Sequence, residues 1–529
     1  MKKFLVLMCV VFYFGLIFGC TIQAVGTEAM VDGSTIVTHN DDSSSADFRL
    51  WIIPAMDWNE DATREIVINS HNYIDYGNYP NVDYGDNGLK MAEIPQISHT
   101  YSYLHSRYSF MNEVGVAMGE STFSISTRTD HGKEVRKVLY EDSYGIIDCW
   151  TAQDIALERA TTAKEAVEIM GDLVEEFGWY GAGEIINVCD GNEVWIAEFY
   201  GLDLWVAFKL PEDAYFVGAN TAMIQEYHPE DSENWMGSPN LISFAVEQGW
   251  YDPNSGEQFN PAAIYGPKSG TNIREWRAFD MVAPSLELEY GELYYPMYVI
   301  PDNKLTVNDI FEIAGDHYEG TEFDLTKGPG AGPWGDPLTN YRIAGRQRPI
   351  GIPLTCYLQI GQVKSWLPDP IKGITWFGYG SVGHSFITPL FPAMGNLPEL
   401  YQNGSRYEEF RRDSGWWINT YVQEVVGSRY EKAIEDLRNF RDPKMQSIYD
   451  TVPILQDAAA KLYEINPDAA IDLLGDYAYD TALGWYDDWL KLGDEIFARY
   501  ACERINFGSN GYPDWWIELL ETDVEIINN

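Results

Sequence analysis

The residues from Cys20 to Asp42 offer the clearest chemistry in this sequence. Cys20 ends an apolar leader, and the polar cluster His39-Asn40-Asp41-Asp42 closes the stretch. Between them, Asp32-Gly33 separates two apolar runs, which is typical of a β-hairpin turn. Such a hairpin would fold the second strand back and bring the polar cluster beside Cys20. We therefore predict that this stretch forms a reactive centre.

A cysteine at the start of a chain supplies a nucleophile and a base together. Its thiol attacks once its proton is removed, and a free α-amine, with a pKa of about 7.7–8.0, can accept that proton near neutral pH. Our hypothesis is that the leader is removed and Cys20 becomes the first residue, with Asp42 holding the new amine in place. Two other interpretations stay open: an ordinary cysteine at the end of a signal peptide, and a lipoprotein cysteine. Lipid on the sulfur would exclude catalysis.

The leader has the pattern of a cleaved secretory signal. Lys2 and Lys3 precede an apolar run from Phe4 to Phe18. Fifteen helical residues span about 22 Å, which is short of the ~30 Å hydrocarbon core of a bilayer. We expect residues 1–19 to be removed and the protein to be exported, whether secreted, periplasmic or on the cell surface. Ile17 suits a signal peptidase poorly, which favours self-processing or another protease.

Composition narrows the classes of partner and cofactor. The 529 residues carry 81 acidic and 35 basic side chains, a net charge of −46, which argues against a nucleic-acid partner. Hydrophobic residues make up 45% and aromatic residues 14% of the chain, as in globular proteins. The six cysteines are scattered without a CxxC pair, and no HExxH pattern occurs. We therefore expect no metal and no cofactor.

The elements that must position this centre follow an α+β pattern. Helices are predicted at 152–160 and after Thr162, where Thr162 and Glu165 form a capping box. Thr306 and Asp309 indicate another helix start. Strands are predicted at 184–189, 194–199, 204–209, 215–218, 355–363 and 373–377. Short turns between successive strands indicate antiparallel sheets covered by helices.

The pattern changes to helices near the end of the chain. From about Ser428, apolar residues recur at helical spacing around Tyr430–Leu437 and Ile454–Leu462, and a third helix starts near Asn466-Pro467. We divide the chain into a leader at 1–19, a catalytic domain at 20–425 and a helical C-terminal segment at 426–529.

With these stretches in view, the chain resembles the PepD-like cysteine dipeptidases of the N-terminal-nucleophile hydrolase superfamily, which are related to penicillin V acylase and bile salt hydrolase. Each matching motif is weak alone, but their shared order from Cys20 to about residue 495 is specific. The matching stretches are Cys20-Thr21, Asp32-Gly33-Ser34-Thr35, Asn40-Asp41-Asp42-Ser43, Asn112–Val116, Trp195–Glu198, Ala219-Asn220, Arg274–Arg277, His317–Asp324, Trp366–Pro370 and Arg412–Trp417.

The resemblance implies a four-layer αββα sandwich and assigns roles by position. Cys20 aligns with the nucleophile and Asp42 with the aspartate that hydrogen-bonds the α-amine. Asn220 aligns with the asparagine whose amide stabilises the oxyanion, a contribution of about 3 kcal/mol in comparable sites. Arg274 aligns best with an active-site arginine, although Arg277 competes with it.

Three further residues are expected to line the substrate site. The backbone from Gly119 to Ser121 would supply a second oxyanion donor. His39 stands where relatives usually carry Arg or Lys, and a neutral imidazole would depress the thiol pKa less than a permanent cation. Either His39 is protonated beside Asp42, or another arginine takes the place of the missing cation.

The resemblance implies that the protein is a dipeptidase, with a dipeptide or another small amide as its substrate. The sequence leaves open an acylase that cleaves non-peptide amides and a non-catalytic, surface-anchored binding lipoprotein. A second copy of the chain is the one macromolecular partner that we retain.

Overall fold

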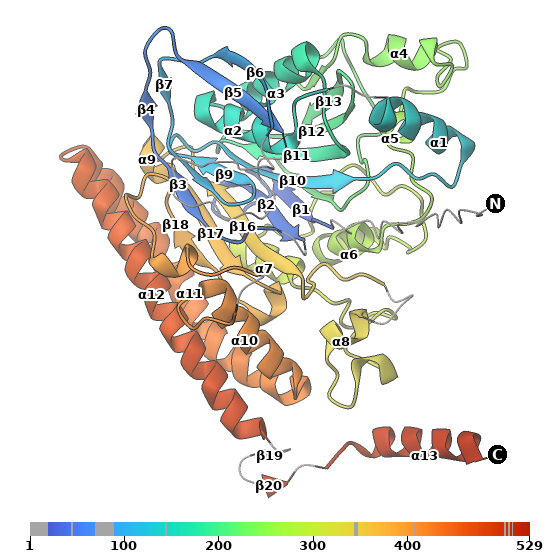
Figure 1. Ribbon diagram of the computed structural model, residues 1–529, viewed down its shortest axis with the longest axis vertical. Helices are drawn as coiled ribbons and strands as arrows, with labels where there is room; N and C mark the ends of the chain where they lie inside the picture. The colour runs from blue at the N-terminus through green and yellow to red at the C-terminus, as the bar shows by residue number, and fades with distance from the viewer. Residues whose placement is uncertain are drawn as a thin grey trace, which may run out of the picture.

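The computed structural model describes residues 19–43, 46–68, 89–142, 145–342, 347–406, 409–501, 504–505, 508–509 and 511–528. Of the predicted leader, only Gly19 falls within these ranges. The described part of the chain is a mixed α and β structure with several antiparallel sheets and a helical C-terminal segment (Figure 1).

A six-stranded antiparallel sheet carries both ends of the predicted reactive stretch. Its strand order is β14-β1-β2-β16-β17-β18. The bounds are β14 Tyr215–Gly218, β1 Ile22–Val25, β2 Thr35–Asp42, β16 Thr355–Val363, β17 Gly373–Tyr379 and β18 Thr388–Leu390. Every residue of β2 and β16 is buried, which explains why neither strand alternates between polar and apolar residues.

A second antiparallel sheet has eight strands, in the order β15-β13-β12-β11-β10-β9-β8-β3. Its strands are β15 Trp235–Gly237, β13 Leu204–Lys209, β12 Val194–Gly201, β11 Gly183–Cys189, β10 Ala117–Phe123, β9 Ser109–Asn112, β8 Tyr103–His105 and β3 Trp51–Ile53. Three two-stranded ribbons pair β4 Met56–Asp57 with β7 His99–Thr100, β5 Thr63–Ile68 with β6 Leu89–Pro95, and β19 Arg504–Ile505 with β20 Gly508–Ser509.

The two large sheets approach each other closely where β2 faces β10 and β11. The Asn187 side chain donates to the Gln23 carbonyl at 2.8 Å, and Gln359 donates to the Met118 carbonyl at 2.9 Å. A Cβ atom on Gly119 would lie 2.2 Å from the Thr38 carbonyl oxygen. Glycine at 119 therefore permits a backbone contact between the sheets that no other residue would allow.

The predicted reactive hairpin forms, but its connection is longer than the sequence suggested. β1 pairs with β2 through Ala24 opposite Val37 and Val25 opposite Ile36. The chain from 26 to 34 leaves this ladder, because the Gly26 and Glu28 amides donate to carbonyls of Ala214 and Glu212 instead. Asp32-Gly33 still turns the chain, with Gly33 at φ 80°, but it does not join the two strands directly.

Helices cover the outer faces of both sheets. α2 (Cys149–Arg159) and α3 (Ala163–Phe177) pack against the eight-stranded sheet. The Thr162 side chain caps α3 as predicted, but the other half of the predicted capping box is wrong, because the Glu165 carboxylate accepts from the Thr161 amide and not from that of Thr162. α7 (Val307–Ala314) begins with the predicted capping box. Two of its backbone carbonyls accept hydrogen bonds from the side chains of Gln23 and Asn40 in the six-stranded sheet. The remaining helices are α1 Asp130–Arg136, α4 Leu241–Glu247, α5 Pro261–Tyr265, α6 Ile273–Val282, α8 Pro337–Tyr341, α9 Asp369–Lys372, α10 Gly415–Gly427 and α13 Asp514–Asn528. Short helical turns lie at Lys137–Glu141, Pro284–Leu286, Pro329–Ala331, Val382–His384 and Glu399–Tyr401.

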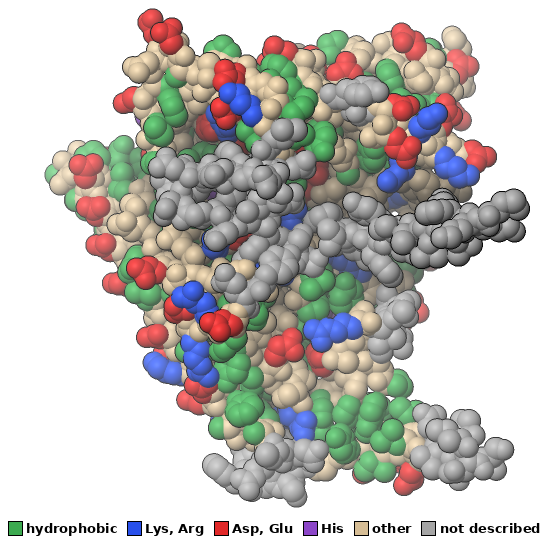
Figure 2. Space-filling view, in the orientation of Figure 1, with side chains coloured by type: hydrophobic (Ala, Val, Ile, Leu, Met, Phe, Trp, Pro, Cys, Tyr) green, Lys and Arg blue, Asp and Glu red, His purple; other side chains and the backbone are tan. Residues whose placement is uncertain are grey.

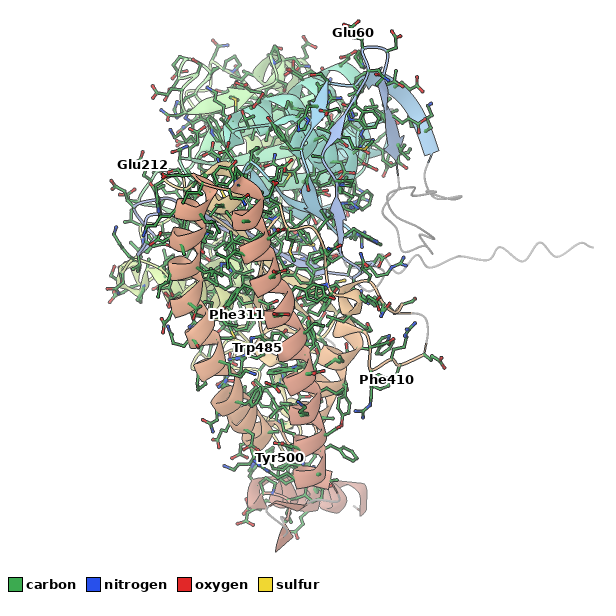
Figure 3. The ribbon with its side chains drawn as sticks, turned by 90° about the vertical axis from the view of Figure 1, so that its left-hand side faces the viewer. Glu60, Glu212, Phe311, Phe410, Trp485 and Tyr500 are labelled. Atoms are coloured by element: carbon green, nitrogen blue, oxygen red, sulfur yellow. The ribbon has the colours of Figure 1, made fainter. Side chains whose placement is uncertain are left out.

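Two 34-residue helices dominate the C-terminal segment and lie side by side (Figure 3). They are α11, Tyr430–Tyr463, and α12, Pro467–Tyr500. The first two predicted helices are wrong as separate elements, because α11 runs through Pro443 and Pro453 with a continuous buried stripe. On α12, Trp485 stacks on Phe386 with ring centroids 4.5 Å apart, which fixes this segment to the six-stranded sheet. The domain boundary at 425 stays a prediction.

The face of the molecule drawn in Figure 2 carries charged side chains of both signs. Figure 2 shows acidic side chains around the visible outline and fewer basic ones among them. Within the described ranges, no helix combines the length and the apolar character needed to cross a bilayer.

Candidate active site

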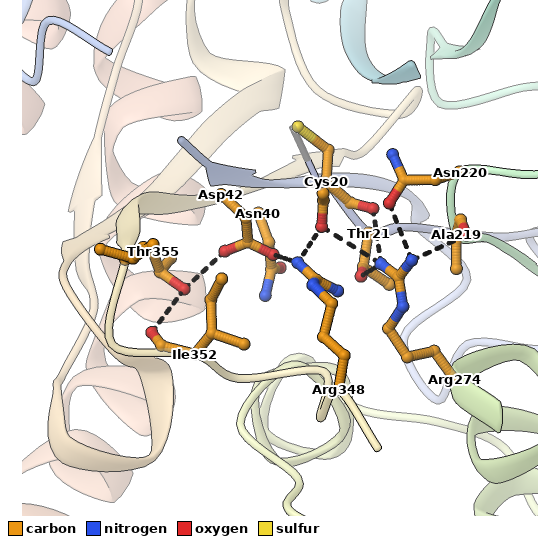
Figure 4. A network of polar contacts seen from close by, with 12 residues as sticks. Cys20, Thr21, Asn40, Asp42, Ala219, Asn220, Arg274, Arg348, Ile352 and Thr355 are labelled. Carbon is orange, nitrogen blue, oxygen red and sulfur yellow. Dashed lines mark hydrogen bonds and ion pairs between the residues drawn. The ribbon is translucent and has the colours of Figure 1, made fainter. Parts of the chain in front are cut away.

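Cys20 lies where β1 begins and β2 ends, so the hairpin brings the two together as the sequence predicted. The Asn40 amide donates to the Thr21 carbonyl at 3.0 Å, and the Gly19 amide donates to the Asp42 carbonyl at 3.2 Å. Cys20 is only 1% exposed. The backbone ladder therefore fixes the thiol beside the last residues of β2 (Figure 4).

Arg274 connects the Cys20 backbone with the loop that carries Asn220 (Figure 4). Its Nη1 donates to the carbonyls of Gly19 at 3.1 Å and Cys20 at 2.9 Å, and its Nη2 donates to Asn220 Oδ1 at 2.8 Å. Arg277, one turn further along α6, pairs instead with Asp316 at 2.9 Å. Of the two arginines that the sequence left in competition, Arg274 is the one that reaches the site.

Asp42 has a partner on each carboxylate oxygen. Oδ1 accepts from the Thr355 hydroxyl at 2.6 Å, and Oδ2 accepts from Arg348 at 2.5 Å. The same Arg348 nitrogen also donates to the Gly19 carbonyl. Burial raises the pKa of Asp42, and Arg348 and Thr355 act against that rise. The sequence analysis missed Arg348 and Thr355, because no spacing relates them to the hairpin.

His39 contacts Glu120 and not Asp42, so the first of the two explanations offered for this residue is wrong. His39 Nε2 lies 3.2 Å from Glu120 Oε1. Residues three apart on a strand point to opposite faces of the sheet, which directs His39 toward β10 and Asp42 away from it. The cation beside Asp42 is Arg348.

Glu120 is a buried residue of β10 that the sequence analysis did not single out. Its Oε1 accepts a hydrogen bond from the Cys20 thiol at 3.3 Å. Burial alone would raise the pKa of Glu120, but the neighbouring His39 holds it at about 2, so the carboxylate is charged. A spacing pattern could not have found Glu120, which lies 100 residues from Cys20.

The Cys20 thiol is protonated in this arrangement. Burial raises its pKa well above the ordinary value, and the carboxylates of Glu120, Asp41 and Asp42 raise it further. A thiolate forms here only when a base takes the proton or a cation enters the site. The described donor atoms of Cys20, His39 and Glu120 lie within 4.8 Å of one another, so a thiophilic metal ion would compete with such activation.

The expected oxyanion residues are close to Cys20 but differ in their contacts. Asn220 has φ 64°, and its backbone amide donates to the Ser121 hydroxyl at 3.1 Å. The Ser121 hydroxyl in turn donates to the Cys20 carbonyl at 3.2 Å. Gly119 lies in the β10 ladder opposite Asn187 and against Thr38. Ser121 thus reaches the centre through its side chain, whereas the prediction invoked its backbone.

The side chains of Asn272, Glu275 and Lys268 form a polar cluster that holds the loop carrying Asn220. Asn272 donates to the Ala219 carbonyl at 2.6 Å and to Glu275 at 2.9 Å, and Lys268 pairs with Glu275 at 3.2 Å. Because Asn272 also caps α6, the helix that carries Arg274 and the loop that carries Asn220 are tied to one another.

Comparisons with known proteins show which proteins this chain is similar to. The model of peptidase family C69 matches residues 19–442. The chain is similar to a probable dipeptidase of Salmonella dublin, with 28% identity over 406 residues, covering 74% of this chain and 86% of the relative. It is 27% identical over 421 residues to a probable dipeptidase of Latilactobacillus sakei, covering 78% and 81%. A dipeptidase of Bifidobacterium longum (strain NCC 2705) is 24% identical over 455 residues, 80% of each chain.

Proposed function

The chain belongs to peptidase family C69, and from this premise we propose that it is an exported dipeptidase whose nucleophile is Cys20. The observation that carries the proposal is the position of Cys20, which is the second residue of the family match. The backbone around Cys20 is hydrogen-bonded to Asp42 and Arg274. The relatives named as dipeptidases support the substrate class.

In the proposed reaction, Cys20 acts after its α-amine has been freed. The amine takes the thiol proton, and the sulfur attacks the carbonyl carbon of the scissile peptide bond. The tetrahedral oxyanion accepts hydrogen bonds from the Asn220 amide and from a neighbouring backbone N–H. The amine then protonates the leaving nitrogen, the C–N bond breaks, and water hydrolyses the thioester to release the first amino acid.

Asp42 and Arg274 would hold the groups that react. Asp42 lies one ladder position from the Gly19–Cys20 bond, which suits it to accept a hydrogen bond from the new ammonium group. Arg274 binds the Cys20 carbonyl and the Asn220 side-chain oxygen together. With its oxygen held by Arg274, Asn220 directs Nδ2 away from that arginine; one N–H of Nδ2 donates to the Thr122 carbonyl, and the other would serve the oxyanion.

Self-cleavage is the route that we propose for exposing Cys20. Arg274 and Arg348 both donate to the Gly19 carbonyl, which is the group that the thiol must attack. In this step sulfur adds to the Gly19 carbonyl carbon, the C–N bond breaks, and the nitrogen takes the thiol proton. Water then releases the leader from the sulfur. Export follows from the signal-like character of residues 1–18.

We also propose the four-layer αββα arrangement of N-terminal-nucleophile hydrolases. Its support is the close approach of β2 to β10 and β11, with α2 and α3 on one outer side and α7, α10 and the long C-terminal helices on the other.

Mass spectrometry of the purified protein, combined with a dipeptide assay, tests the function. We expect a chain that starts at Cys20 and hydrolyses dipeptides, and a Cys20→Ala variant that has lost the activity. Cys189→Ala is the matched control, because Cys189 is equally buried but lies at the far end of β11. An active protein that retains Met1, or an acylglycerol adduct on Cys20, would contradict the proposal; the adduct would support the binding lipoprotein.

A further inference from the structure

Asp41 is a buried carboxylate to which no described residue is hydrogen-bonded. The residue is 0% exposed, and neither Oδ1 nor Oδ2 is hydrogen-bonded to any described residue. Leaving one buried polar atom unpaired costs about 1–3 kcal/mol, and a buried charge costs more. Such a group in a native protein calls for an explanation, and a catalytic role or a bound ion is among those that are known.

The position of Asp41 places it on the catalytic side of β2. It lies two residues from His39, and residues two apart on a strand share a face. That face meets Glu120, which contacts His39 at 3.2 Å and the Cys20 thiol at 3.3 Å. Across the ladder, Tyr357 pairs with Asp41, and its hydroxyl also lacks a partner among the described residues.

Basic and acidic side chains influence Asp41, but no described residue is hydrogen-bonded to its carboxylate. Arg107, His39 and Arg406 lower the pKa of Asp41, and Glu120 raises it. Arg107 uses Nη1 to bind the Ser43 hydroxyl at 2.8 Å. Burial outweighs these cations and raises the pKa of Asp41 to about 6. An additional cation close to Asp41 would therefore stabilise its charged form.

We propose that Asp41, together with Glu120, binds the free α-ammonium group of the dipeptide substrate. This inference rests on the proposed function and names the feature by which the site selects its substrates. In a dipeptide the ammonium nitrogen is two covalent bonds from the scissile carbonyl carbon, or about 2.5 Å away. A carboxylate that touches the Cys20 thiol is therefore within reach of the ammonium group when the sulfur contacts that carbonyl.

The same contact would prepare the nucleophile. Glu120 and Asp41 are two of the charges that keep the Cys20 thiol protonated, and an ammonium ion between them offsets both. A substrate with a free amine thus lowers the pKa of the thiol on binding. An N-acetylated substrate brings no charge and leaves a buried carboxylate unpaired, so it is rejected in two ways.

The test compares Ala-Ala with N-acetyl-Ala-Ala as substrates of mature enzyme. We expect the natural sequence to prefer Ala-Ala by about 100-fold or more in kcat/KM. Asp41→Asn should reduce kcat/KM for Ala-Ala by about 10- to 100-fold and change hydrolysis of N-acetyl-Ala-Ala less than threefold, whereas Asp41→Glu should restore part of the preference. Asp190→Asn is the matched control, since Asp190 is equally buried but accepts hydrogen bonds from three backbone amides.

Four results would separate the possibilities. A preference that survives Asp41→Asn within threefold overturns the ammonium site and leaves the dipeptidase intact. Hydrolysis of N-acetyl-Ala-Ala in preference to Ala-Ala overturns the site in favour of an acylase. Hydrolysis of neither substrate overturns both proposals. Should Asp41→Asn not fold, calorimetry decides with a Cys20→Ala chain produced without residues 1–19, because this variant could not remove the leader itself. Binding of Ala-Ala but not of N-acetyl-Ala-Ala supports the site, and equal binding of the two overturns it.

Discussion

Asp41 and Asp42 are neighbours on β2 whose carboxylates lie on opposite faces of the strand and differ in their hydrogen bonds. On the face toward α7, both oxygens of Asp42 are hydrogen-bonded, to Thr355 and Arg348. On the face toward β10, neither oxygen of Asp41 is hydrogen-bonded to a residue that the structure describes, although both Asp41 and Asp42 are almost completely buried. Burial alone therefore does not distinguish scaffold from binding site. For these two carboxylates, the difference lies in whether described residues are hydrogen-bonded to their oxygens.

Arg274 gives the largest effect expected on the satisfied side. Arg274→Met removes the donors to the Gly19 and Cys20 carbonyls and to Asn220, so we expect kcat/KM for a dipeptide to fall about 1,000-fold. The matched control is Arg277→Met, three residues along the same helix, where the guanidinium binds Asp316. Activity should be followed together with the mass of the N-terminal peptide. Equal losses in the two variants would show that the arginine acts only through folding.

Removing the charge of Asp41 should stabilise the protein. The pKa of Asp41 is raised from 3.8 to about 6 in the folded chain, so ionisation weakens folding as the pH rises from about 4 to 6 and the penalty stays constant above that. Asp41→Asn should therefore increase the free energy of unfolding at pH 7 by about 3 kcal/mol, and by almost nothing at pH 3.5. Denaturant titrations of ligand-free Cys20→Ala proteins at both pH values measure this gain. A loss of stability at pH 7 would mean that Asp41 has a partner after all.

Asp42→Asn, in contrast, should destabilise the protein and reduce its activity. Burial raises the pKa of Asp42 too, but replacing it by Asn leaves the guanidinium groups of Arg348 and Arg274 without its negative charge, and this loss outweighs the relief. The catalytic amine loses the same charge, so both stability and activity should decrease. We expect kcat/KM to fall about 100-fold at neutral pH. Thr355→Val, which removes only the hydroxyl on Oδ1, should lower kcat/KM by less than tenfold. The contrast between the faces fails if Asp42→Asn is more stable than the natural sequence.

The smallest effect is expected in the scaffold behind the satisfied face. Thr306→Ala removes the side-chain cap of α7, whose Ala314 carbonyl accepts from Asn40. Loss of such a cap lowers the free energy of unfolding by about 1 kcal/mol. Thermal melting should record the change while kcat/KM for a dipeptide stays constant. A tenfold drop in kcat/KM would show that the position of α7 tunes the site directly.

The sequence predicted the local features of this fold well, because each depended on neighbouring residues. Thr162 and Thr306 cap helices through donors only three residues away, and the strand from 355 to 363 has the predicted bounds. The return of Asp42 toward Cys20 also followed from local hairpin chemistry. The tight connection at Asp32-Gly33 failed because distant carbonyls at 212 and 214 take up the amides of 26 and 28.

The partners of Cys20 were predictable only where a hairpin or a family motif marked them. Glu120, Arg348 and Thr355 contact the centre from 100 to more than 300 residues away, and no periodicity records such distances. Asp41 was within the predicted cluster, yet the sequence could not reveal that its oxygens are unpaired, since this depends on what the second sheet brings opposite it.

The backbone pairing on both sides of Cys20 has a consequence for any chain end created there. Thr21 bonds with Asn40, and Gly19 bonds with Asp42, so the ladder continues across the bond that maturation would break. Folding orders this stretch before the new terminus exists, so the entropic cost of about 1–2 kcal/mol per residue belongs to folding and not to cleavage. The register of β1 against β2 would thus set the position of the new N-terminus. A shift of β1 by a single residue would displace the amine together with the sulfur.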